Sequence, residues 1–500
     1  MYTLAEVIQR KRIGLLATGA VAVLLTLAIL LPENAHALPL FARQTGQNCV
    51  ACHAGGQFPE LTPYGRIFKM TGYTIGNRVA VPVSAMAVAG YAKVRDTSKS
   101  DDPQADFQKN ATPLLSSGSI FAGGKITDNI GAFAQWTYDN YANQDVDGHF
   151  RGHASADNME LRFADRYIDA NRDLIYGVSV NNNPSLSDPW NTAAAWMQYV
   201  PAPSPTSSQF VDANAPFPGF GSGGNLAGLS AYFFLNQSIY AELGTYRTAD
   251  RALSFMSAGI SDQDKTRLQG NNNPYWRLAF SHEWGAHNVM IGTSGMVAHV
   301  FDNGTNTSDS NNLGRFRNNG VDAQYQYLLD PHSVTAQLAF MRQVQNHSAN
   351  TIAGAASPYF LSDGVTPVAA ANASDTVNVL RMKLSYIYQA KYGGSMSFFN
   401  STGTANTLNQ TSGFDSNGQI TSTDPLGTGI TSTRVNGTLT GSTAARGMTY
   451  EAFWMPLQYV RVGAQFTAYN KYNGARDNYD GFGRNARDNN SLLLYVWGAY

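Results

Sequence analysis

The sequence has 500 residues and a formal net charge of −1. That balance excludes strong attraction to nucleic acid or to anionic lipid through net charge alone, so we expect no nucleic-acid partner. Charged residues make up 14% of the chain, against about a quarter in ordinary globular proteins, whereas aromatic residues make up 12%. This composition is compatible with a transmembrane β-barrel, although a secreted soluble β-protein shares much of it.

Residues 1–37 have the organisation of a secretory signal peptide. Residues 10–12 are all basic, residues 13–31 form an uncharged and mostly apolar run, and Ala35-His36-Ala37 is a small-x-small cleavage site. The apolar run is also long enough to stay uncleaved as an inner-membrane helix, so cleavage is left open. Either way, the pattern predicts export from the cytoplasm.

The segment Cys49-Val50-Ala51-Cys52-His53 has the spacing of a c-type haem attachment motif. Both thiols add to the haem vinyl groups, and the adjacent imidazole becomes the proximal ligand of the iron. A redox dithiol is the alternative, but it does not need the histidine. These are the only two cysteines in the chain. We therefore expect one covalent haem c bound through Cys49, Cys52 and His53.

Residues 38–77 are predicted to form a small α-helical cytochrome segment around this motif. Thr62-Pro63 supplies a helix N-cap and first residue, Tyr64, Ile67 and Phe68 recur at helical spacing, and Gly72 is a plausible stop. Roughly forty residues cannot build an ordinary hydrophobic core. The segment must therefore use the haem as buried apolar surface or pack against something larger.

The residues around the motif resemble the N-terminal part of the fused outer-membrane monohaem cytochrome c–porin family, whose best-known members are iron oxidases. The resemblance covers residues 41–75 and rests on Phe41-Ala42-Arg43-Gln44-Thr45-Gly46, Leu61, Gly65-Arg66, Phe68-Lys69 and Gly72-Tyr73. It implies one N-terminal haem c and a porin-like barrel behind it. It also implies that electrons pass from extracellular Fe(II) to a periplasmic carrier, such as a soluble cytochrome.

Residues 78–500 show repeated segments of alternating polarity, as expected for half-buried strands. Between 274 and 284, for example, Trp276, Leu278 and Phe280 share one face, while Arg277 and Ser281 share the other. One face suits lipid and the other a wet lumen. Sixteen such segments lie near 80–95, 114–126, 130–142, 157–169, 173–181, 226–235, 238–248, 274–284, 287–300, 317–329, 333–345, 375–389, 393–401, 446–454, 457–471 and 490–500.

The connections between these segments alternate between short and long. Short ones fall at Asp128-Asn129, Gly285-Ala286 and Met455-Pro456, for instance, and long ones at 182–225 and 402–445. Short periplasmic turns and long external loops are typical of an outer-membrane barrel, and the last segment ends on an aromatic residue. We therefore predict a mainly β protein, a 16-stranded antiparallel transmembrane β-barrel in contact with outer-membrane lipid. An even strand number places the haem segment in the lumen or at the periplasmic mouth.

A sixth haem ligand is usual for electron transfer, and methionine raises the potential. Met86, on the first predicted strand, and Met70, in the cytochrome segment, are both candidates. Met86 is slightly favoured because Met70 lies so close in sequence to His53, although a methionine more often fills a core. His149 and His153 are four apart, but exposed loop histidines explain them better than a metal pair.

These features predict an outer-membrane electron conduit that takes electrons from an external donor, Fe(II) by resemblance. Three alternatives remain. The same architecture can serve another donor or the opposite direction of electron flow. The barrel can be a porin whose haem segment is only a plug. Finally, the protein can be a soluble periplasmic cytochrome with a β-sandwich domain.

Overall fold

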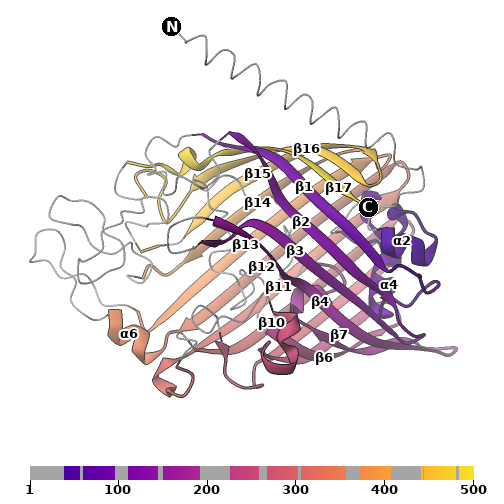
Figure 1. Ribbon diagram of the computed structural model, residues 1–500, viewed down its shortest axis with the longest axis horizontal. Helices are drawn as coiled ribbons and strands as arrows, with labels where there is room; N and C mark the ends of the chain where they lie inside the picture. The colour runs from indigo at the N-terminus through magenta and orange to yellow at the C-terminus, as the bar shows by residue number, and fades with distance from the viewer. Residues whose placement is uncertain are drawn as a thin grey trace, which may run out of the picture.

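The computed structural model describes residues 39–56, 60–95, 111–144, 150–191, 226–257, 267–301, 306–355, 372–406, 441–442, 444–479 and 483–500 (Figure 1). The predicted signal peptide at 1–37 lies outside these ranges. Among the described helices, none is long and apolar enough to span a membrane.

The described strands form one closed antiparallel barrel. Each long strand pairs with the next along the chain, and β1 pairs with β17, which closes the sheet. A two-residue strand, β8, pairs beside β9 with β10. The strands are β1 (Val83–Val94), β2 (Thr112–Lys125), β3 (Ile130–Gln144), β4 (Phe150–Ile168), β5 (Asp173–Asn181), β6 (Leu226–Leu235), β7 (Ile239–Thr248), β8 (Arg267–Leu268), β9 (Pro274–Trp284), β10 (His287–Phe301), β11 (Leu313–Leu329), β12 (His332–Asn346), β13 (Ser374–Tyr388), β14 (Tyr392–Gly403), β15 (Ala445–Leu457), β16 (Val460–Lys471) and β17 (Ser491–Ala499).

The two faces of the sheet differ in the way that the alternation predicts. On β9, Leu278 and Phe280 are half exposed on the outer face, whereas Arg277, Ala279 and Ser281 are buried in the interior. The same outward display of large apolar side chains recurs around the described barrel. A closed sheet with an apolar exterior and a polar interior has the surface of an outer-membrane β-barrel. The prediction of a 16-stranded barrel is therefore confirmed, with β8 as an additional short pairing.

Several strand ends differ from the predicted ones. β4 begins at Phe150 rather than near 157, so β3 and β4 continue through most of the predicted loop 143–156. β15 runs on to Leu457, which moves the turn from Met455-Pro456 to 458–459. The added part of β15, Met455-Pro456-Leu457, is apolar throughout and does not alternate, whereas residues 150–156 of β4 do alternate although their first members are Phe, Arg and Gly. Pairing with β3 and with β16 extends these strands beyond the predicted ends.

The N-terminal segment lies at one end of the barrel. It contains α2 (Pro39–Thr45), α3 (Cys49–Cys52), the 3₁₀ turn η1 (Ala54–Gly56) and α4 (Pro63–Met70). Figure 1 shows α2 and α4 beside the C-terminus, at the end opposite α6 (Ala349–Ala355). The short strand connections lie here too, since Gly72 approaches Gly131 and Gly55 approaches Ile387. We call residues 39–77 the plug segment and this end of the barrel the short-turn end.

Buried polar side chains fix the plug segment to the barrel wall. Arg66 on α4 donates to Gln326 at 2.9 Å and to Asn288 at 2.8 Å, both on the lumen face. Tyr73 donates to Glu160 at 2.6 Å. These bonds span 87 to 260 positions of sequence. Because each buried polar group is costly to leave without its partner, the plug segment is expected to fold as one unit with the barrel.

The beginning of the predicted loop 182–225 folds into the lumen. Residues 182–191, the inward segment, include the short helix α5 (Pro184–Ser187) and Trp190, which is fully buried. Arg277 of β9 binds the Asp188 carboxylate at 3.3 Å, and Lys69 of α4 donates to the Asp188 carbonyl at 2.8 Å. The inward segment thus touches both the wall and the plug segment, whereas we expected an external loop.

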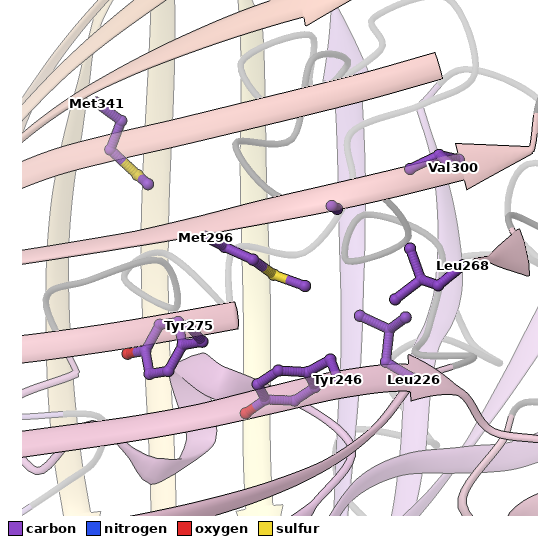
Figure 2. Close-up of a cluster of buried hydrophobic side chains, with 8 residues drawn as sticks. Leu226, Tyr246, Leu268, Tyr275, Met296, Val300 and Met341 are labelled. Carbon is purple, nitrogen blue, oxygen red and sulfur yellow. The ribbon is translucent and has the colours of Figure 1, made fainter. Parts of the chain in front are cut away.

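A buried cluster of apolar side chains lies on the lumen side of β6 to β12. Figure 2 shows its tyrosine, methionine and aliphatic side chains, which converge from neighbouring strands. This apolar patch is an exception to the polar lumen that the barrel pattern predicts. Its members are Leu226, Tyr246, Leu268, Tyr275, Met296, Ala298, Val300 and Met341.

Candidate functional site

A pocket lies between the plug segment, the barrel wall and the inward segment. Cys49, Cys52 and His53 line it from the plug segment, Met86 lines it from β1, and Asn191 lines it from the inward segment. Its empty space is about 1050 Å³ when the open solvent at its mouth is included. Four of the five residues singled out from the sequence therefore meet in one cavity.

The backbone around the cysteines is a single helical turn held in place from α4. The His53 amide donates to the Cys49 carbonyl at 2.8 Å, which closes the turn of α3. The Thr62 amide donates to the Cys52 carbonyl at 2.9 Å. The Thr62 hydroxyl also accepts from the Gly65 amide at 3.1 Å, so the predicted N-cap is present. One turn of helix presents both thiols on the side of the pocket.

Gly65 is where α4 touches this turn. A Cβ placed on Gly65 would lie 2.1 Å from the Cys52 carbonyl oxygen, a backbone atom that cannot turn aside. Overpacking of this kind costs about 1–3 kcal/mol. We expect Gly65→Ala to displace the cysteine turn and lower the amount of covalent haem per barrel, measured by haem staining against protein mass. Gly118→Ala, whose added Cβ meets nothing closer than 4.0 Å, should load normally; equal loading of both variants would contradict this reasoning.

The environment of His53 and Cys52 fits haem ligation better than dithiol redox chemistry. Burial lowers the pKa of His53 to about 4, so the imidazole is neutral at pH 7 and has a nitrogen lone pair for a metal. Burial, with a smaller effect of Cys49, raises the pKa of Cys52 to about 11. A reactive redox cysteine needs the opposite shift, toward thiolate.

The structure separates the two methionine candidates. Met86 is buried on the lumen face of β1 and lines the pocket with the cysteines. Met70 packs instead into an apolar cluster with Trp190 and Tyr240, and its carbonyl accepts from the Tyr232 hydroxyl at 2.6 Å. Met70 does not line the pocket. The geometry therefore favours Met86 as the residue available to a group held there.

Aromatic side chains form one wall of the pocket. Phe41 stacks on Tyr73 with ring centroids 5.5 Å apart and meets Phe68 edge-on at 5.1 Å. On the barrel side, Phe133 lies 6.1 Å from Phe41 and 5.9 Å from Phe121. All five line the pocket. Such rings give a flat apolar macrocycle extensive contact area and exclude water from it.

Several polar residues at the pocket were not singled out from the sequence. Lys69, Gln135 and Asn158 line it and are each more than nine-tenths buried. Gln135 accepts from Asn158 at 3.0 Å. In the sequence, Gln135 and Asn158 are merely polar positions on the lumen faces of two strands. Lys69 belongs to the Phe68-Lys69 pair that carries the resemblance and is one of two basic residues on α4, but neither feature marks it as a pocket residue.

The histidines on the barrel do not gather into a metal centre. His153 is exposed on β4, and His149 lies outside the described residues. His287 and His332 bind the hydroxyls of Tyr325 and Tyr386 at 2.8 and 2.9 Å on the exterior of the short-turn end. Within the described ranges, no group of three or more His, Cys, Asp or Glu residues is placed to hold a metal ion.

The chain matches no known protein family and no curated protein by sequence. It is similar in structure to an OmpF complex with daunomycin from Salmonella typhi, with 12% identity, coverage of 84% of this chain and 97% of the other, and a TM-score of 0.41. It is also similar to the anion-selective porin from Comamonas acidovorans, with 7% identity, coverage of 84% of this chain and 99% of the other, and a TM-score of 0.40. A third similar structure is the outer-membrane channel DcaP of Acinetobacter baumannii, with 8% identity, coverage of 84% of this chain and 97% of the other, and a TM-score of 0.40.

Proposed function

We propose that the protein is an outer-membrane electron conduit with one covalent haem c in the lumen of its barrel. The observation that carries the proposal is the pocket that brings Cys49, Cys52, His53 and Met86 together inside a closed sheet. The haem, when bound, would supply one-electron transfer through its iron. A segment that only blocked the barrel would not require two thiols, an imidazole and a thioether around one cavity.

The residues that line the pocket would each hold the haem in a different way. Cys49 and Cys52 would form the thioether links, His53 the proximal bond and Met86 the distal one. Met86 arrives from the barrel wall, so the two axial ligands belong to different parts of the fold. A thioether ligand and an apolar aromatic wall both favour the ferrous form and raise the potential.

The donor and the direction of transfer follow from the resemblance of residues 41–75 to the cytochrome–porin family. We propose that extracellular Fe(II) gives its electron to the haem and that a periplasmic cytochrome, or another soluble carrier, receives it at the short-turn end. In this arrangement that end faces the periplasm. The long connections of the barrel then face the exterior, where insoluble ferric product is left outside the cell.

The test uses the full chain, matured in a bacterium that attaches c-type haem and extracted in detergent. We expect a covalent haem stain, a single redox transition and rapid reduction on mixing with Fe(II). Haem that stays oxidised in the presence of Fe(II) would contradict Fe(II) as the electron donor but would be compatible with a conduit for another donor. A chain without covalent haem would remove the conduit itself.

The cysteines give the corresponding mutational prediction. Cys49→Ser combined with Cys52→Ser should abolish covalent haem, because both thioether links are lost. Val50→Ser, at an exposed side chain between the two cysteines, is the matched control and should load normally. Both proteins should keep the barrel, checked by heat-modifiable gel mobility. Haem that remains bound through denaturing electrophoresis in the double variant would contradict the attachment.

Ion conductance in planar bilayers separates this proposal from a porin with a haem-bearing plug. The plug segment lies at the short-turn end, and Lys69 joins it to the inward segment through hydrogen bonds to Asp188 and Asn191. We expect conductance far below that of an open 16-stranded channel. A steady, porin-like conductance would favour the porin.

A further inference from the structure

Lys69 is the one charged residue that lines the pocket in the described part of the chain. It lies on the last turn of α4, and only 6% of its surface is exposed. Its ammonium donates to the Asp188 carbonyl at 2.8 Å and to the side-chain oxygen of Asn191 at 3.3 Å. Both acceptors are uncharged, so the described residues give this buried cation no direct ion pair.

The nearby carboxylates are engaged with other donors. Glu160 accepts from Arg162 at 2.7 Å and from Tyr73 and Ser179 at 2.6 Å each. Asp188 binds Arg277 through its carboxylate, and only its backbone carbonyl faces Lys69. A buried charge is costly unless it is paired. Among the described residues, two of the three ammonium hydrogens of Lys69 have acceptors, and neither acceptor is charged.

We infer that Lys69, beside Asn191 at the pocket, binds a propionate carboxylate of the haem. This inference rests on the proposed function and adds a role that the attachment motif does not specify. Haem brings two carboxylates into whatever pocket receives it. A buried ammonium whose acceptors are both neutral has the complementary chemistry.

The pairing has a consequence for the reduction potential. A positive charge beside the haem stabilises the ferrous state relative to the ferric state, and the low-dielectric interior strengthens this effect. Lys69→Gln should therefore shift the haem equilibrium about tenfold toward the ferric form, a fall of about 59 mV for one electron. Lys69→Arg keeps the charge and should stay close to the wild-type potential.

The experiment measures the potential and the resonance Raman bands of the propionates in the haem-loaded full chain. The inference expects lowered potential and altered propionate bands in Lys69→Gln. Lys125→Gln is the control, since that ammonium pairs with Asp128 on a turn at 2.8 Å, outside the pocket; it should match wild type in both readings. The propionate bands distinguish direct pairing of Lys69 with the propionate from a role of Lys69 that is limited to holding the inward segment in place.

Unchanged potential and unchanged propionate bands in a haem-loaded Lys69→Gln protein would overturn the inference. If that variant does not assemble, Lys69→Arg decides. A guanidinium on the propionate must alter its bands, whereas bands identical to wild type would show that no contact exists. A wild-type chain that binds no haem would refute the proposed function instead, so the two failures are distinguishable.

Discussion

Replacement of Met86 by His is expected to lower the reduction potential of the haem-loaded protein by a few hundred millivolts. The axial ligand is a main determinant of haem potential, which ligand choice moves over about 0.8 V across proteins, and methionine lies toward the high end. Met86 is the candidate methionine that lines the same pocket as Cys52 and His53. Spectroelectrochemical titration measures the shift, and loss of the absorption band that marks sulfur–iron(III) ligation identifies the lost bond.

Met70→Leu is the matched control, because Met70 is buried in the cluster with Trp190 and Tyr240 and does not line the pocket. A swap between these two residues of similar volume usually costs less than about 1.5 kcal/mol, so the protein should fold and keep its potential. The opposite pattern, with a large shift for Met70→Leu and none for Met86→His, would mean that haem binding rearranges the plug segment.

The choice between these methionines shows what the sequence can decide. Ser84, Met86 and Val88 share one face of β1 because side chains alternate between the faces of a strand, although Ala85 and Ala87 on the other face are apolar as well. That this face is the interior follows once the barrel closes. Met70 is different, since its direction depends on how α4 packs against β5, β6 and β7, and no local pattern contains that information.

The strands were predictable because each carries its own alternation, with one face for lipid and one for the lumen. The inward segment was not. Its residues are polar or proline-rich like those of an external loop, and its burial depends on Arg277, 89 positions from Asp188, and on the plug segment. Lys69 was missed for the same reason. Contacts between elements remote in sequence determine these positions.

The buried ion pairs of Arg277 are expected to keep the lumen closed, and their loss should have the largest effect on stability. Arg277 on β9 binds Asp188 of the inward segment at 3.3 Å and Asp322 of β11 at 2.7 Å. Arg277→Leu leaves two buried carboxylates without their cation, which costs about 3–5 kcal/mol. We expect the inward segment to leave its place in part, and ion conductance through the barrel to rise.

Two variants make this result specific. Arg166→Leu removes a partly exposed ion pair between β4 and Asp173 at the start of β5, worth about 0–1 kcal/mol, and should change neither conductance nor the midpoint of urea unfolding. Arg277→Leu combined with Asp188→Asn and Asp322→Asn removes all three charges and should recover much of the stability, because uncharged partners are cheaper to bury than unpaired ions. If Arg277→Leu alone stays closed and stable, the plug segment seals the lumen without help from the inward segment. In that case the ion pairs of Arg277 are not needed to close the lumen.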